Sequence, residues 1–257
     1  MTDSLLDALQ LPASCRLGAR ITKKMLLENA KTLPADRKAI TNDVENVAWQ
    51  YTLKPSTIAI VPYADDEREY DEIAVLEATL KSPKNASRIA EVIHRSIPYP
   101  LILGVCHDDR QLLSLAPKRF SRSEKGATVA EEFASTGWMR LTSRTAIEAA
   151  FVDSIASWKL PQSNYFAFYS ALVDRVVALR TACRTGEYHV VSGRALREAR
   201  LRLLAEADVL EAQARECRVA LTREGQFNRK VELNSMIKQI EERLTVVARE
   251  LKIPNGA

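Results

Sequence analysis

The sequence of 257 residues is poor in chain-breaking residues and has no long apolar run. Only 8 glycines and 10 prolines occur. So few of them argue against a long disordered tract. No run of about 18 apolar residues occurs, so no membrane span is predicted. The start, MTDSLLDALQLP, lacks the basic residues and apolar core of a signal peptide. We therefore expect a cytoplasmic location.

The residues that usually carry metals or cofactors are also scarce. The four cysteines are far apart and form no CxxC pair, and three histidines complete a poor zinc set. The sequence has no GxxxxGK[ST] phosphate loop, no GxGxxG after a strand, no HExxH and no GxSxG. We expect no metal site and no cofactor. The cysteines are Cys15, Cys106, Cys183 and Cys217.

The charge is nearly balanced. There are 37 Lys and Arg against 33 Asp and Glu, a net charge of +4. This small excess permits contact with nucleic acid without requiring it. Hydrophobic residues make up 46% and charged residues 27%, as in an ordinary soluble protein. The length is enough for one large domain or two smaller ones.

The first part of the chain alternates between strand and helix patterns. Apolar residues recur with period two in 47–53, and 57–63 follows so closely that an antiparallel hairpin is expected. A helical pattern in 85–98 stands between an apolar strand at 70–81 and another at 100–107. The order strand–helix–strand predicts a right-handed parallel crossover. Residues 1–160 are therefore expected to form a mixed α/β domain.

From residue 161 onward the pattern is helical, and two long helices are expected at 193–222 and 227–252. Apolar residues recur every seven residues in the first and at 4-3 spacing in the second. The short break TREGQ predicts that they fold back as an antiparallel coiled-coil hairpin. The fold class is thus α+β, a mixed sheet followed by helices. The seam residues expected to contact each other or a partner are Leu203, Leu210, Ile237, Ile240 and Leu244.

One strand invites comparison with metal-dependent nucleases. YDEIAVLEATLK (70–81) carries Glu77 and Lys81 and follows an acidic run that includes Asp66 and Asp71. Nucleases of the restriction type place Glu and Lys two residues apart on one strand face, so that both serve one metal. Here the spacing is four, about 13 Å along a strand. The alternative is an edge strand whose charges deter aggregation.

Basic clusters provide candidate contacts to phosphate. One, PKRFSRSEK (117–125), begins in the strand predicted at 111–120, and another opens the helix at 193–222. Such groups neutralise phosphates, but solvated helix faces have the same composition. The candidates are Lys118, Arg119, Arg122, Lys125, Arg194 and Arg197.

The order of several motifs resembles that of the bacterial domain-of-unknown-function family 4391. The motifs are LPASCRLGARITKK, VENVAWQYTLKPSTIAI, EIAVLEATLK, IPYPLILGV and the late FNRKVELN. Genes of that family tend to lie beside helicases and adenine-specific DNA methyltransferases. The resemblance therefore implies a part in a restriction-like anti-phage defence locus, without a known reaction. The polar and aromatic motif positions are Lys23, Trp49, Glu72 and Lys81.

The sequence thus favours a non-enzymatic accessory or adaptor subunit that docks a helicase or methyltransferase through its helical hairpin and possibly touches DNA. One alternative is a metal-dependent DNA nuclease that uses Glu77 and a nearby acid. The other is a DNA-binding module without catalysis.

Overall fold

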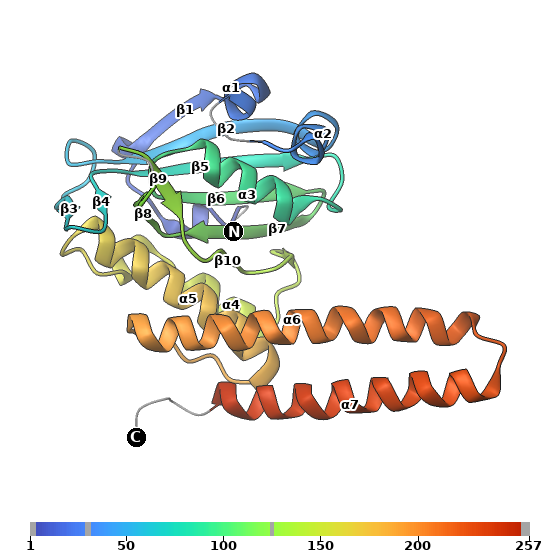
Figure 1. The fold of residues 1–257 in the computed structure, drawn as a ribbon. Coiled ribbons are helices and arrows are strands. Elements are labelled where there is room, and N and C mark those ends of the chain that lie inside the picture. Colours follow the sequence, from blue (N-terminus) through green and yellow to red (C-terminus); the bar gives the residue numbers. More distant parts are fainter. Residues whose placement is uncertain (1–3, 29–31, 124–125, 253–257) are drawn as a thin grey trace. The chain divides into compact units, whose positions relative to one another are not determined.

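The computed structural model describes residues 4–28, 32–123 and 126–252 (Figure 1). The chain divides into two compact units, Met1–Val176 and Val177–Ala257. Helix α5 (Tyr165–Thr185) contributes residues to both. The class is mixed, as predicted: a sheet in the first part is followed by several helices. No described helix is long and apolar enough to cross a membrane.

A seven-stranded mixed sheet forms the centre of the first unit. Its order is β1-β2-β5-β6-β7-β10, and β11 also pairs with β7. Only the β5–β6 pair is parallel, and the neighbours along the rest of the sheet are antiparallel. The strands are β1 (Arg16–Arg20), β2 (Val44–Leu53), β5 (Ile73–Leu80), β6 (Leu101–His107), β7 (Arg110–Ala116), β10 (Ala134–Ser135) and β11 (Met139–Arg140).

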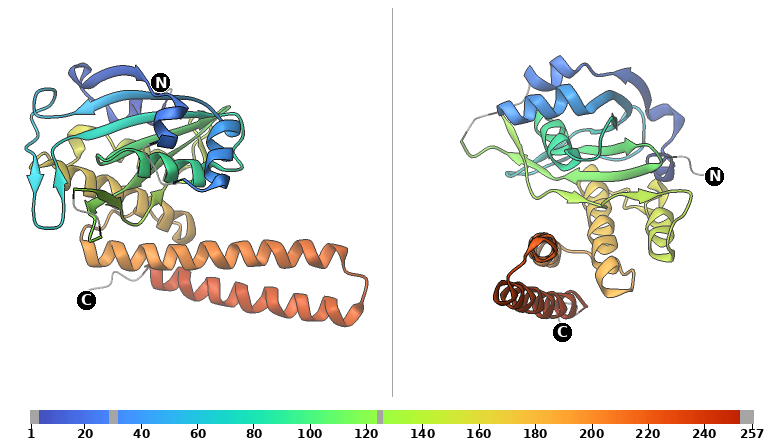
Figure 2. Two further views of the ribbon diagram at one scale, coloured as in Figure 1. Left: turned by 45° about the horizontal axis from the view of Figure 1, so that its top comes forward. Right: turned by 90° about the vertical axis from the view of Figure 1, so that its right-hand side faces the viewer.

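The parallel pairing of β5 and β6 confirms the predicted crossover. Helix α3 (Ala86–Ser96) connects them, and its buried stripe includes Ile89, Val92 and Ile93. With α1 (Lys23–Glu28) and α2 (Pro34–Asp43), it covers one face of the sheet (Figure 2). Alternate residues of β5 enter this core because successive side chains of a strand point to opposite faces. They are Ala74, Leu76, Ala78 and Leu80.

The opposite face is covered partly by the N-terminal segment that includes the short helix η1 (Asp7–Leu9). Leu6 is buried directly over Gly104 of β6. A Cβ atom added at Gly104 would lie 3.1 Å from Cγ of Leu6, tighter than ordinary contact. Glycine at this position therefore allows the segment to approach the sheet closely.

The hairpin expected between 47–53 and 57–63 is wrong. Both edges of β2 are occupied, by β1 on one side and β5 on the other, so no edge is left for a third strand. A turn replaces the strand: Lys54 N–H donates to Oγ1 of Thr57 (3.0 Å), and the Thr57 hydroxyl donates to the Thr52 carbonyl (2.9 Å). The partner strand β1 was not predicted. Its five residues are all exposed, so they show no apolar alternation.

Smaller elements complete the first unit. The acidic run forms a hairpin of β3 (Tyr63–Ala64) and β4 (Glu69–Tyr70), and β8 pairs with β9. The first turns of α5 bind the sheet through Tyr169, whose hydroxyl donates to Leu101 O and accepts from Ala116 N, both at 2.8 Å. The remaining elements are η2 (Ala13–Cys15), β8 (Lys118–Phe120), β9 (Thr128–Ala130), α4 (Ala146–Ser154) and η3 (Ser157–Lys159).

The second unit contains the end of α5 and two long helices, α6 (Arg194–Arg223) and α7 (Phe227–Lys252). They lie side by side and run in opposite directions, joined by residues 224–226 (Figure 1). Their bounds agree closely with the helices predicted at 193–222 and 227–252.

A buried polar pair lies at the carboxyl end of α3. Lys118 is only 2% exposed, and its ammonium donates to the carbonyls of His94 and Ile97. The imidazole of His94 is fully buried, with Nε2 3.1 Å from Oγ of Ser114. Burial lowers the pKa of His94 to about 3, and the nearby Lys118 charge adds to this effect. Burial also lowers the pKa of Lys118 to about 8.

The His94 shift predicts a stability change with pH. The unfolded chain binds a proton on this histidine near its ordinary pKa of 6.5, whereas the folded protein binds it only near 3. The unfolded state holds more protons between these values, so stability falls as pH falls through this window, by at most about 1.4 kcal/mol per pH unit. His94→Gln removes this dependence. Urea unfolding at pH 7.5 and 4.5 should show the variant gaining stability relative to the wild type at the lower pH. A pH-independent difference between the two proteins would contradict the assignment.

Candidate functional site

The residues proposed for a nuclease do not converge. Glu77 lies midway along β5, where Ala48 and Gly104 are its strand partners, and its carboxylate is 3.4 Å from Nε2 of Gln50. Asp66 lies in the β3–β4 turn, and Asp71 lies six residues before Glu77, about 20 Å along an extended chain. Within the described residues, no group of three or more His, Cys, Asp or Glu side chains is arranged to hold a metal ion.

The acidic run instead organises its own hairpin. The carboxylate of Asp65 accepts from the backbone N–H groups of Glu67 and Arg68 (both 2.8 Å) and from the Tyr63 hydroxyl (2.7 Å). The Tyr63 bond is the main reason why the pKa of Asp65 is lowered. Arg68 is buried, with its guanidinium 4.9 Å from the ring centre of Phe166 in α5. These acids therefore fix a turn against a helix.

The charge of Glu77 acts on a neighbouring thiol. Cys106 of β6 is partly buried, and burial together with the Glu77 carboxylate raises its pKa to about 12. The thiol therefore stays protonated at neutral pH. A protonated thiol is a poor nucleophile and a poor metal ligand.

Of the family-motif residues, Glu72 and Lys81 flank the two ends of β5, Lys23 lies near Lys81, and Trp49 lies within β2. The ammonium of Lys23 donates to Thr41 O (3.0 Å), and its pKa is lowered by burial and by the charge of Lys81. Glu72 comes directly before Ile73, the first residue of β5, and burial raises the pKa of Glu72. Trp49 donates from Nε1 to Tyr51 O (3.0 Å) within β2. These residues support the sheet and do not form one site.

The basic candidates are dispersed. The interpretation of Lys118 as a phosphate contact is wrong, because its buried ammonium binds the end of α3. Arg119 is half-buried and lies 3.8 Å from Glu131. Arg122 is exposed, and Lys125 lies outside the described residues. In α6, Arg194 pairs with Glu198 (2.8 Å), and Arg197 is half-buried.

Arginines of α5 bind the middle of α6. Asp208 of α6 accepts from Arg180 at 2.6 and 2.8 Å and from Arg184 at 2.8 Å, and Arg184 also pairs with Glu211 (3.0 Å). Two arginines that share one carboxylate form a network, which holds a fixed geometry better than an isolated surface pair.

The seam between α6 and α7 is fully buried at only some of its positions. Ala207 and Ala214 of α6 are buried, as are Leu233, Val247 and Leu251 of α7. Between Leu233 and Leu251, the predicted seam positions are buried or half-buried, and most of the positions between them are exposed. The seam residues predicted to contact a partner are only half-buried: Leu203, Leu210, Ile237, Ile240 and Leu244.

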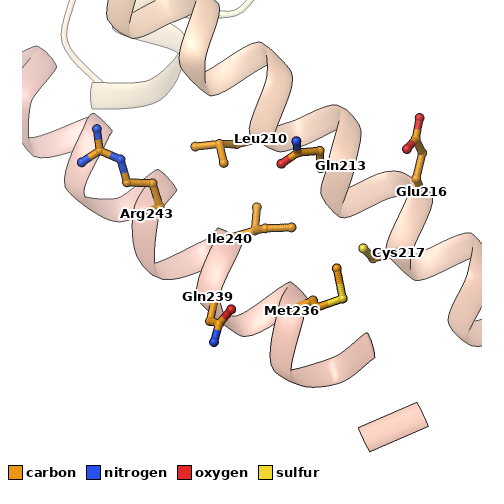
Figure 3. A pocket seen from close by; sticks show the side chains of 8 residues that line it. All are labelled: Leu210, Gln213, Glu216, Cys217, Met236, Gln239, Ile240 and Arg243. Atoms are coloured by element: carbon orange, nitrogen blue, oxygen red, sulfur yellow. The ribbon is translucent and has the colours of Figure 1, made fainter. Parts of the chain in front are cut away.

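This incomplete burial leaves a groove of about 450 Å³ along one side of the seam (Figure 3). Its floor is apolar and comes from both helices: Leu210, Cys217, Met236 and Ile240. Its borders are polar: Gln213 and Glu216 on α6, Gln239 and Arg243 on α7. An ion pair between Glu206 and Arg243 (2.6 Å) bridges the two helices near the end where α6 begins.

Helical periodicity extends the apolar side of the hairpin beyond the groove. At 100° per residue, Val209 and Val246 project toward the same side as the groove, and both are exposed. The other side carries charges such as Arg218 and Glu241, which pair between the helices at 2.8 Å. Sequence reasoning found the seam but missed Met236, because a single apolar residue beside a seam is indistinguishable from ordinary surface until both helices are placed.

Fold and site together define an α+β protein with a helical hairpin that presents an apolar groove. The family model "Domain of unknown function (DUF4391)" matches residues 9–244, and the chain belongs to this family. Comparisons with curated proteins and with solved structures gave no match.

The packing of the seam can be tested by placing a larger side chain at one of its buried positions. Ala207→Leu should lower the free energy of unfolding by about 1–3 kcal/mol, because the larger side chain forces α6 and α7 apart. Ala205→Leu is the matched control, since Ala205 is exposed on the same helix and should change stability by less than about 0.5 kcal/mol. Urea denaturation followed by circular dichroism measures both. Equal effects of the two substitutions would show that the seam is loosely packed.

Proposed function

We propose that this protein is a non-enzymatic accessory subunit whose α6–α7 groove binds one amphipathic helix of a partner protein. The supporting observation is the groove itself, an apolar floor bordered on both sides by amide and charged side chains. Those borders confine the apolar floor to one side of the hairpin. A hydrophobic strip with polar borders is the usual form of a helix-binding groove.

A third helix would complete the burial that two helices leave unfinished. The seam residues, at heptad spacing, would then pack as a coiled coil, with apolar residues of the bound helix inserted between Leu210, Cys217, Met236 and Ile240. The ligand should carry apolar residues at i, i+3 or i+4, and i+7. The Gln213 and Gln239 amides would then lie beside its polar flanks.

The family resemblance indicates which partner to test first. We propose that the bound helix belongs to a helicase or an adenine-specific DNA methyltransferase of a restriction-like anti-phage locus. In this role the sheet unit is a folded platform, and the hairpin is the recognition element. The scattered carboxylates of the sheet unit support an accessory role better than a nuclease.

The groove is tested with Met236→Glu. Met236 is 47% exposed, so the substitution should leave the fold intact but place a charge in the groove. Co-purification with the helicase or methyltransferase encoded beside the gene should fall at least tenfold. Val231→Glu is the control: Val231 is 51% exposed but projects from another side of α7, and this variant should bind normally.

Two results would contradict the proposal. One is equal binding by the wild type and Met236→Glu. The other is a wild-type dimer, measured by light scattering, that Met236→Glu converts to a monomer, which would assign the groove to a second copy of this chain.

A further inference from the structure

The turn that joins α6 to α7 carries an exposed aromatic ring. Phe227, the first residue of α7, is 77% exposed and is the most exposed large apolar side chain among the described residues. Its neighbours Gln226 and Asn228 are polar, and both are exposed. An isolated ring in such surroundings has no role in folding the hairpin. Its exposure calls for a ligand with an aromatic face.

Basic residues surround this ring. The half of the hairpin nearest the turn, residues 213–240, contains six Lys or Arg and three Glu. Arg223 ends α6, and Arg229 and Lys230 lie in the first turn of α7. The other three basic residues, Arg215, Arg218 and Lys238, lie farther from the turn. These counts give the half of the hairpin nearest the turn a net charge of +3.

The acids nearest the ring are already engaged. The carboxylate of Glu224 accepts from the backbone N–H groups of Gly225 and Gln226, both at 2.8 Å. Glu232 pairs with Arg229 at 2.5 Å. Within the described part of the chain, neither Arg223 nor Lys230 forms a salt bridge, although the charge of Lys230 helps to lower the pKa of Glu224. Both are exposed, so two cations outside any salt bridge flank Phe227.

The helix ends contribute at the same place. The 26-residue helix α7 begins at Phe227, and its first turn carries a partial positive charge and N–H groups without helical partners. The carboxyl end of α6 is partly negative, and Arg223 in its last turn offsets this charge. An anion at the turn would therefore meet two side-chain cations and a helix amino terminus.

We propose that this turn binds single-stranded nucleic acid, with a base stacked on Phe227 and phosphates held by Arg223 and Lys230. An aromatic ring beside paired cations matches the alternation of base and phosphate along one strand. A duplex fits less well, because its bases are already stacked and offer no free face. A membrane surface also fits less well, since one ring among polar residues buries little apolar area.

The test uses the full-length protein and a fluorescently labelled oligonucleotide of about 20 nucleotides at low salt, with binding measured by anisotropy. Phe227→Ala should weaken binding to the single strand roughly tenfold or more, as expected for the loss of a stacked base. Val209→Ala is the control, because Val209 is also exposed on the hairpin but lies 14 residues before the end of α6.

The proposed phosphate contacts are tested separately, through the salt dependence of binding. The double substitution Arg223→Gln, Lys230→Gln should reduce the slope of log K against log salt by about 1.4, since each phosphate contact on a single strand contributes about 0.7. The control, Arg202→Gln with Arg249→Gln, removes two exposed cations from the other end of the hairpin and should leave the slope unchanged. Unchanged circular dichroism would show that all four variants fold.

Several results would overturn the proposal: no binding at low salt, tighter binding to a duplex than to the single strand, or equal binding by Phe227→Ala and wild type. Phe227-dependent binding to vesicles containing anionic lipid, without binding to the oligonucleotide, would reassign the turn to a membrane. Met236→Glu should bind the oligonucleotide normally, so failure of the groove proposal and failure of this one are distinguishable.

Discussion

The parallel pairing of β5 with β6 is the constraint that most of the first unit satisfies. Parallel strands require a crossover, and α3 supplies it. The crossover helix ends inside the protein, where its last carbonyls need donors. Lys118 provides them from beyond β7, at the cost of burying an ammonium. The neutral imidazole of His94 fits beside this cation because burial already keeps it unprotonated at neutral pH.

The hairpin satisfies a different constraint. Two helices share one seam, and a single seam buries only a narrow strip of each helix. Buried alanines form part of this seam and α5 arginines bind the middle of α6, but neither adds apolar cover to the groove side. The residues of the groove floor stay incompletely buried because only two helices pack there, whereas a third would complete the packing. The candidate site is thus a consequence of the architecture, not of an unusual side chain.

Periodicity explains what was predictable. An unbroken apolar strand, an amphipathic helix and another apolar strand indicated β5, α3 and β6, and heptad spacing indicated the buried positions of α7. Features that depend on partners far away in the sequence could not be predicted. The strand pattern at 57–63 was misleading because β2 pairs with β1, which has no alternation to detect. Lys118 resembled a surface charge because its acceptors belong to a helix more than 20 residues earlier in the chain.

The groove and the turn are separate surfaces on one rigid element. Met236 and Phe227 are nine residues apart on α7, about 14 Å along the helix axis. A helix bound beside Met236 therefore leaves the ring and cations of the turn open to a strand of nucleic acid. Chemistry supports the same division, because the groove floor is apolar whereas Arg223, Arg229 and Lys230 lie beside the turn. On the two proposals above, the protein would hold a partner helix along the hairpin and bind a strand of nucleic acid at its end.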